Sequence, residues 1–179
     1  MGERYLALLG SINIGGNRVK MVALKSALAK AGFAELETVA ASGNVILTDT
    51  RDPATIEAQL EQVLERDFGF KSCAMVRSRA EIVSAINDNP FHGVGSDKMV
   101  HSIFLADQPD QARFDAFAKE RQGKGDETLA LGDRVLFLDY VHGVSASDIT
   151  GKLLERRLGV RGTARNMNSL KNILAKMDA

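Results

Sequence analysis

The order in which hydrophobic periodicity changes along the first 77 residues most constrains the fold. Residues 5–9 form a short apolar run, which is typical of a buried strand. From Val19 the apolar residues recur at helical spacing, so a helix is predicted there. Two strand-like segments follow at 37–40 and 44–48, joined by the turn Ala41-Ser-Gly43. Residues 5–48 are therefore predicted to form a strand, a helix and a β-hairpin, in that order.

A second helix and a fourth strand complete the same unit. Asp52 precedes Pro53 in the arrangement of an N-cap followed by the first helical residue, and Gly69 is a suitable stop. Residues 71–77 alternate in the manner of another strand. Residues 1–77 therefore predict β-α-β-β-α-β, the order of ferredoxin-like folds.

The second half repeats this order after a connecting helix that opens on the capping-box pattern Ser78-Arg-Ala-Glu81. The expected elements are a strand at 100–105, a helix at 109–119, strands at 127–131 and 134–140, a helix ending at Gly159, an extended piece at 162–165 and a terminal helix. The predicted class is α+β, with two packed βαββαβ-like (ferredoxin-like) halves and an extra C-terminal helix. The predicted division is 1–77, a connector at 78–98, and 99–179.

Composition excludes several classes of protein. No apolar run approaches the ~20 residues of a membrane helix, and the N-terminus lacks a signal-peptide cleavage pattern. The single Cys73 excludes an internal disulfide and a cysteine-based metal site. His92, His101 and His142 lack ligand spacing, so we expect no metal and no cofactor. A cytoplasmic protein without membrane association is the expectation.

Charge is balanced overall but unevenly distributed. Residues 151–179 contain seven basic and two acidic residues, a surplus of five, and because the chain has no net charge the other 150 residues carry minus five. A basic segment can meet phosphates or an acidic partner, and it can equally be a solvated helix face. With zero net charge, no tryptophan and two tyrosines, strong non-specific affinity for nucleic acid is not expected.

The stretch LLGSINIGGNRVKM, residues 8–21, holds the first candidate site. Gly10 and Gly15 have P-loop spacing, but Gly16 and Asn17 replace the lysine and hydroxyl that a P-loop requires. What remains is a glycine turn before a helix N-terminus, a place that favours an anion. The alternative is a turn that needs positive φ angles.

The second candidate lies before the terminal helix. Arg161 and Arg165 are expected near the positive N-terminal end of that helix, where like charges repel. An anion bound between them and the helix would make this arrangement favourable, and Asn166 can cap the helix. Exposed arginines beside an ordinary cap are the alternative. The residues predicted to bind a ligand are Ser11, Asn13, Gly15, Gly16, Asn17, Arg18, Lys20, Ser42, Asn44, Arg165 and Asn166.

Several segments together resemble a known family: YLALLGSINIGG at 5–16, VKM at 19–21, ASGNV at 41–45, NPF at 89–91, LLERRLGV at 153–160 and TARN at 163–166. The chain resembles a bacterial family of uncharacterised proteins, catalogued only as a domain of unknown function, number sixteen ninety-seven. The resemblance implies an α+β fold with a ferredoxin-like first half and supplies no reaction or catalytic residue. Gly10-Ser11 replace the family's usual Arg-Gly, Asp148 stands where a cation is common, and Met167 replaces a frequent tryptophan.

Three functions remain open. The first is binding of a phosphate-bearing or other anionic ligand, a small molecule, nucleotide or RNA, near glycine-rich turns and helix N-termini. The second is an enzyme of unknown reaction with a site between the halves, drawing on Asn13, Ser42, Asn44, His92 and Arg165. The third is a non-catalytic protein that self-associates into a homo-oligomer or binds another protein. No acid–base pair identifies a reaction.

Overall fold

The computed structural model describes residues 1–179, which form two compact units. The first unit comprises Met1–Ile82 with Asn172–Ala179, and the second comprises Val83–Lys171. The division falls inside α3 (Arg79–Asn87) and α6 (Met167–Met177). The predicted domain boundaries at 77 and 99 stay predictions. No helix is long and apolar enough to cross a membrane.

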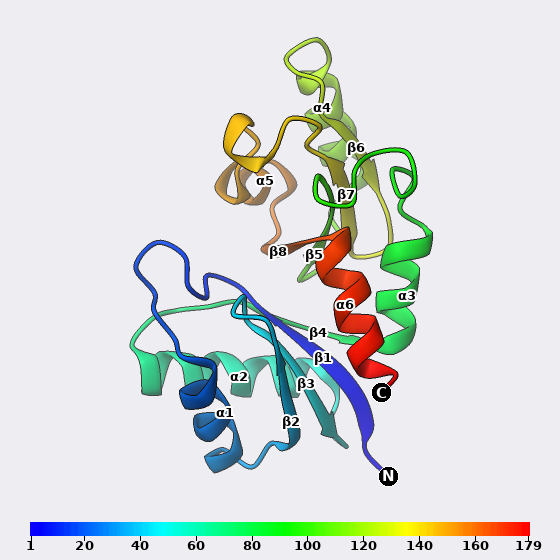
Figure 1. The fold of residues 1–179 in the computed structure, drawn as a ribbon. Helices are drawn as coiled ribbons and strands as arrows, with labels where there is room; N and C mark the ends of the chain where they lie inside the picture. Colours follow the sequence, from blue (N-terminus) through cyan, green and yellow to red (C-terminus); the bar gives the residue numbers. More distant parts are fainter. The chain divides into compact units, whose positions relative to one another are not determined.

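The first unit is an antiparallel four-stranded sheet in the order β2-β3-β1-β4, with two helices on one face (Figure 1). Its elements are β1 (Glu3–Leu9), α1 (Met21–Lys30), β2 (Ala34–Val39), β3 (Asn44–Asp49), α2 (Pro53–Phe68) and β4 (Ala74–Ser78). Asp52 accepts a hydrogen bond from the Thr55 amide, and Gly69 ends α2 in the left-handed conformation at φ 75°, as the sequence predicts.

The core of the first unit lies between the sheet and these helices. Alternate β1 residues Tyr5, Ala7 and Leu9 share one buried cluster with Leu28 of α1 and Leu60 of α2. Successive strand residues point to opposite faces of a sheet, so every second residue of β1 lies on the face that the helices cover. The buried residues of these helices all belong to this core; they are Leu24, Ala27 and Leu28 in α1 and Ile56, Leu60, Val63 and Leu64 in α2.

The second unit has the equivalent strand order, β6-β7-β5-β8, and is also antiparallel. Its elements are β5 (Val100–Leu105), α4 (Gln111–Arg121), β6 (Thr128–Leu131), β7 (Val135–Asp139), the 3-10 helix η1 (Val144–Ala146), α5 (Gly151–Leu158) and β8 (Gly162–Asn166). Ile103, Phe117, Leu138 and Leu158 lie in its buried cluster. The predicted α+β class with two similar halves is confirmed.

Each unit's last strand runs directly into a helix, and both helices begin with a side-chain cap. Ser78 and Glu81 form the predicted capping box, with Ser78 N donating to Glu81 Oε2 at 2.8 Å and Glu81 N donating to Ser78 Oγ at 3.3 Å. At the equivalent place, Ser169 N donates to Asn166 Oδ1 at 2.9 Å. An arginine precedes each cap, Arg77 in β4 and Arg165 in β8.

The outer edge of β4 is covered by carboxylates. Ala74 N donates to Glu61 at 3.0 Å, and Val76 N donates to Glu57 at 2.7 Å. The Ser78 amide donates to Glu81, as described above. Unpaired strand edges invite pairing with another chain. Carboxylates that occupy these amides therefore protect this edge from strand addition.

Two strand boundaries differ from the prediction by three residues, and the others by two residues or fewer. β2 begins at Ala34, three residues before the predicted start. β4 begins at Ala74 and not at the predicted residue 71, so Cys73 precedes the strand, and its side chain is half-buried. Residues 72 and 73 bond instead to Gly10, the first residue after β1. Gly10 N donates to the Cys73 carbonyl at 2.8 Å, and Ser72 Oγ donates to the Gly10 carbonyl at 2.6 Å.

Candidate functional site

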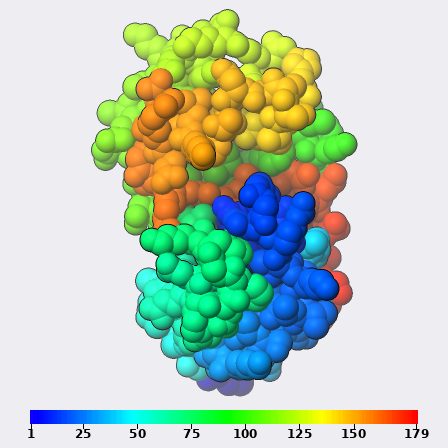
Figure 2. Space-filling view, turned by 90° about the vertical axis from the view of Figure 1, so that its left-hand side faces the viewer, coloured from blue at the N-terminus to red at the C-terminus, as the bar shows by residue number.

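The β1–α1 loop (residues 10–20) and the turn between β2 and β3 form one continuous structure in the first unit. Leu9 N donates to the Gly43 carbonyl at 2.8 Å. Gly43 has φ 80°, and an added Cβ would lie 2.8 Å from Ile12 Cγ1, so only glycine fits there. Figure 2 shows the loop in blue at the surface, beside the green segment that precedes β4. The structure thus brings the predicted segments 11–20 and 42–44 together.

Asn13 joins these two segments. Its Nδ2 donates to the Ala41 carbonyl at 2.7 Å and to the Val19 carbonyl at 3.2 Å, while its Oδ1 accepts from Val19 N at 2.9 Å. Its φ of 55° is left-handed, a conformation that asparagine tolerates better than most residues. Asn13 therefore positions the loop.

The remaining predicted loop residues divide into positioning and exposed groups. Asn17 Nδ2 donates to the Ser11 carbonyl at 3.2 Å, and Asn17 O accepts from Asn13 N at 2.8 Å. Gly15 and Gly16 are exposed with φ 61° and 94°, and an added Cβ at either would meet nothing within 4 Å. The glycine pair therefore supplies the backbone turn and leaves open space above it.

The start of α1 carries positive charge without a side-chain cap. Lys20 is the N-cap residue, its side chain makes no capping hydrogen bond, and the first turn holds no acidic residue. Arg18 and Lys20 are exposed and form no ion pair. The first amides of a helix and its macrodipole attract anions. This helix end is therefore electropositive and open to solvent.

Ser42 and Asn44 have structural partners in the β2–β3 turn. Asn44 is buried, and its Nδ2 donates to the Val39 carbonyl at 3.0 Å and to Ser42 Oγ at 2.9 Å. A buried amide with such partners fixes the hairpin geometry. Their role in ligand binding stays a prediction.

The structure places Arg165 and Asn166 in the second unit, at the end of β8. Arg165 is buried, and its Nη1 donates to Thr163 Oγ1 at 2.9 Å and to the Ala164 carbonyl at 2.8 Å. Asn166 caps α6, one of the roles that the sequence predicts. The alternative of an exposed Arg165 is wrong, because Thr163 and Arg165 are the alternate residues of β8 that lie on its buried face.

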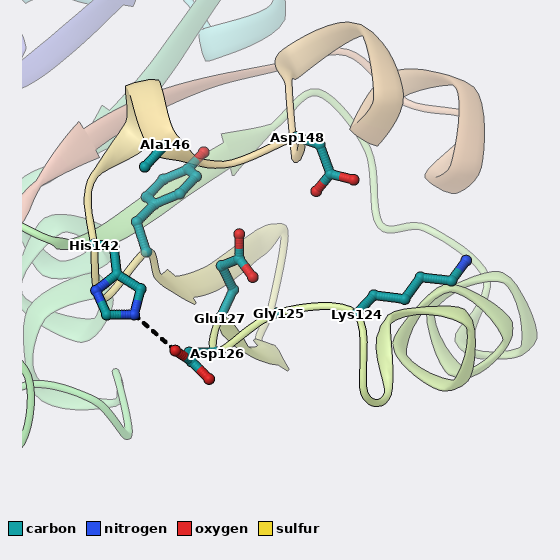
Figure 3. Close-up of a pocket in the computed structure, with 8 residues that line it drawn as sticks. Lys124, Gly125, Asp126, Glu127, His142, Ala146 and Asp148 are labelled. Atoms are coloured by element: carbon teal, nitrogen blue, oxygen red, sulfur yellow. Dashed lines mark hydrogen bonds and ion pairs between the residues drawn. The ribbon is translucent and has the colours of Figure 1, made fainter.

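The second unit also contains a cavity that the sequence did not predict (Figure 3). Its volume is about 280 Å³. The β7–α5 connection and the loop before β6 line it, and the lining residues are Lys124, Gly125, Asp126, Glu127, Tyr140, His142, Ala146 and Asp148. His142 Nε2 lies 2.7 Å from Asp126 Oδ2 at its exposed rim. Residues from two separate segments meet here, so no local motif announces the cavity.

Internal partners already engage the carboxylates around this cavity. Arg121 donates from Nη2 to Asp148 Oδ1 at 2.6 Å and from Nη1 to Oδ2 at 3.0 Å, and these bonds lower the pKa of Asp148. Ser147 Oγ donates to Glu127 Oε1. Burial raises the pKa of Tyr140 to about 12, so it is a neutral hydroxyl. No three His, Cys, Asp or Glu side chains are placed to hold a metal ion.

Arg77 is a further buried cation that the sequence analysis did not single out. Its Nη1 donates to the Val76 carbonyl at 3.0 Å and lies 3.7 Å from Glu57 Oε1. The repeated pattern of an arginine followed by a helix cap, at 77–78 and 165–166, is the signal that could have revealed it.

Comparisons with known proteins agree with this architecture. The family described as "Protein of unknown function (DUF1697)" matches residues 2–137. A search of curated proteins gives no significant match. Among solved structures, the conserved bacterial protein SP0830 from Streptococcus pneumoniae is similar, with a TM-score of 0.76, 20% identity and 100% of both chains covered. At this identity the similarity concerns the fold alone.

Proposed function

Because the chain belongs to the DUF1697 family of proteins of unknown function, we propose a function from its own geometry: it binds a phosphate-bearing or other anionic ligand at the N-terminal end of α1. A nucleotide or RNA is the ligand class that we propose. The binding surface comprises the glycine pair, Arg18, Lys20 and the first amides of α1.

The uncapped, electropositive start of α1 carries this proposal. Most helices satisfy an early amide with a Ser, Thr, Asp or Asn cap, whereas α1 has lysine in that place. A helix N-terminus flanked by cations is a suitable place for phosphate oxygens. Gly15 and Gly16 lack Cβ atoms, so their backbone offers no steric barrier to a nearby phosphate.

Asn13 supports the same proposal by fixing the loop before a ligand arrives. Its three hydrogen bonds tie the loop to Val19 and Ala41, so little ordering entropy remains to be lost on binding. The loop's own amides and the α1 amides then act as a preorganised surface.

Calorimetric titration with pyrophosphate and with a mononucleotide tests the proposal at low salt. The double variant Arg18→Gln/Lys20→Gln should weaken binding by roughly tenfold or more, because two charge-assisted contacts are lost. Lys25→Gln/Lys30→Gln is the matched control, since both lysines are exposed on the same helix but lie beyond its first turn. Equal losses in the double variant and the control, or no binding by the wild type, would overturn the proposal.

The enzyme and self-association hypotheses stay predictions without a specific observation in their favour. The β4 edge is occupied by carboxylates, which removes one route to strand-mediated oligomers. The cytoplasmic location and the expected lack of a cofactor also stay predictions.

A further inference from the structure

A line of exposed cations runs along α5 in the second unit. Lys152 and Arg156 are four residues apart, so they lie on the same helix face with Cβ atoms about 6 Å from each other. Gly159 follows three residues after Arg156 and continues this face at the end of the helix. Figure 2 shows α5 in orange at the surface.

Arg113 of α4 extends the line at Gly159. A Cβ added to Gly159 would lie 2.7 Å from Arg113 Nη1 and 3.2 Å from Arg113 Cζ, so the guanidinium rests against the glycine backbone. The φ of 75° is what requires glycine at position 159, because Arg113 meets it only with the far end of a flexible, exposed side chain. We call Lys152, Arg156 and Arg113 the α5 stripe.

The charge of the α5 stripe is not neutralised by partners. All three side chains are exposed, and none forms an ion pair. Neighbouring Arg157 differs, because its Nη2 donates to Glu120 at 2.8 Å. Glu155 is the single carboxylate of α5 and stands beside the stripe. α5 thus contributes two cations to the stripe against its one carboxylate, and α4 contributes Arg113, three residues after the exposed N-cap residue Asp110.

We propose that the α5 stripe binds the phosphodiester backbone of double-stranded nucleic acid, independently of the α1 site. A row of point charges along a rod-like surface complements a polyanion better than a single small anion. Arginine and lysine contacts to phosphates need no reading of base edges, so binding is independent of sequence.

Two observations favour a duplex over other polyanions. The aromatic residues of α4, Phe114 and Phe117, are buried, and α5 has none, so there is no platform for stacking single-stranded bases. All exposed large hydrophobic residues lie outside α4 and α5; they are Met1, Ile14, Val22, Val94, Val141 and Val144. Without apolar side chains to insert, an anionic membrane is a poorer partner.

Fluorescence anisotropy with a labelled RNA duplex of about 16 base pairs, and with its DNA equivalent, tests the proposal on the full chain. Three phosphate contacts predict that log K falls against log salt with a slope of about −3. Lys152→Gln should reduce this slope by about one and weaken binding about tenfold at ~50 mM salt. Glu155→Gln should strengthen binding.

Lys98→Gln is the charge-matched control, because Lys98 is exposed in the same unit but lies on neither helix. Its affinity should stay within about twofold of the wild type. Circular dichroism should establish that every variant is folded. The Arg18→Gln/Lys20→Gln protein should retain duplex binding, which separates this proposal from the α1 site.

Three results would overturn the proposal: no duplex binding at ~100 µM protein in low salt, equal losses in Lys98→Gln and Lys152→Gln, or loss of binding in the Arg18→Gln/Lys20→Gln protein alone. Binding of vesicles containing anionic phospholipid, lost in Lys152→Gln while duplexes fail to bind, would assign the stripe to a membrane surface instead.

Discussion

The Asn13 side chain bonds to three backbone groups, two of Val19 and one of Ala41, and its contribution can be measured at the scale of one residue. It donates to the Ala41 and Val19 carbonyls and accepts from the Val19 amide. These bonds hold the β1–α1 loop against the β2–β3 turn in the conformation that leaves Gly15 and Gly16 open.

Replacing Asn13 with alanine should lower the free energy of unfolding by about 2–3 kcal/mol, because three hydrogen bonds are lost and alanine disfavours a positive φ. Asn13→Gly loses the same bonds without the backbone strain, so it should be about 1 kcal/mol less destabilising than Asn13→Ala. Urea denaturation measures both. A loss below ~0.5 kcal/mol in Asn13→Ala would contradict the role assigned to this side chain.

Gly10 is close-packed against Cys73. An added Cβ would lie 2.5 Å from Cys73 Sγ, so Gly10→Ala should cost about 1–3 kcal/mol through overpacking. Cys73→Ala removes the sulfur and should relieve part of that cost, so the double variant should be at least ~1 kcal/mol more stable than the sum of the single effects predicts. Strict additivity in denaturant titrations would show that the two side chains do not meet.

At the scale of the element, α1 begins without the cap that would stabilise it most. Lys20 has the extended backbone conformation of an N-cap, φ −75° and ψ 133°, but its side chain caps nothing. A lysine N-cap makes α1 less stable than a serine or aspartate N-cap would. Residues that lower stability in this way are often found at functional sites, which agrees with the proposal that Lys20 binds a ligand.

Lys20→Ser should therefore stabilise the protein by about 0.5–1 kcal/mol while weakening anion binding, since the serine oxygen would accept from an early α1 amide and the cation is lost. Thermal unfolding and pyrophosphate titration on the same preparations measure both effects. Lys25→Ser serves as the control for removing a lysine from α1. Stabilisation with unchanged binding would separate the helix end from the ligand.

The order of elements could be predicted from the sequence because helices with one buried face repeat apolar residues at a 3.6-residue period, whereas the fully buried strands β1, β5 and β7 are short apolar runs. The helix caps at Asp52 and Ser78 could also be predicted, because each capping side chain and its partner are only three residues apart in the sequence. The first residues of β2 and β4 could not be predicted in this way, because hydrogen bonds to other segments determine them.

The sites divide in the same way. The candidate residues at 11–20 and 42–44 lie beside one another in the first unit, because β1 and β3 are adjacent strands, and their role in ligand binding stays a prediction. The cavity between residues 124–127 and 140–148, and the contact of Arg113 with Gly159, depend on pairs far apart in the chain. Periodicity contains no information about such pairs.

At the scale of the whole molecule, the buried His101 links stability to pH. Burial lowers the pKa of His101 below its usual value of 6.5, although the Met99 carbonyl at 2.7 Å from Nδ1 and the Asp139 charge act in the opposite direction. The unfolded chain then binds a proton at a higher pH than the native protein does. The neutral, buried His101 therefore contributes fully to the free energy of unfolding above pH 6.5. This contribution is lost as the pH falls from 6.5 through the lowered pKa of His101 in the native protein.

His101→Phe retains a ring for the edge contact with Tyr140, whose centroid lies 4.9 Å away, and removes the titration. Urea denaturation between about pH 5 and pH 8 should show a smaller fall in stability towards acid for the variant than for the wild type. Parallel pH profiles for the two proteins would mean that His101 does not contribute to the acid sensitivity.

The central claim is that an anion binds at the N-terminal end of α1, and backbone amide chemical shifts test it most directly. Pyrophosphate added to ¹⁵N-labelled protein should shift, in a saturable way, the amides of Gly15, Gly16 and Met21–Ala23. The same amides should stay in place in the Arg18→Gln/Lys20→Gln variant. Saturable shifts confined to other parts of the chain, or none at millimolar pyrophosphate, would contradict the claim.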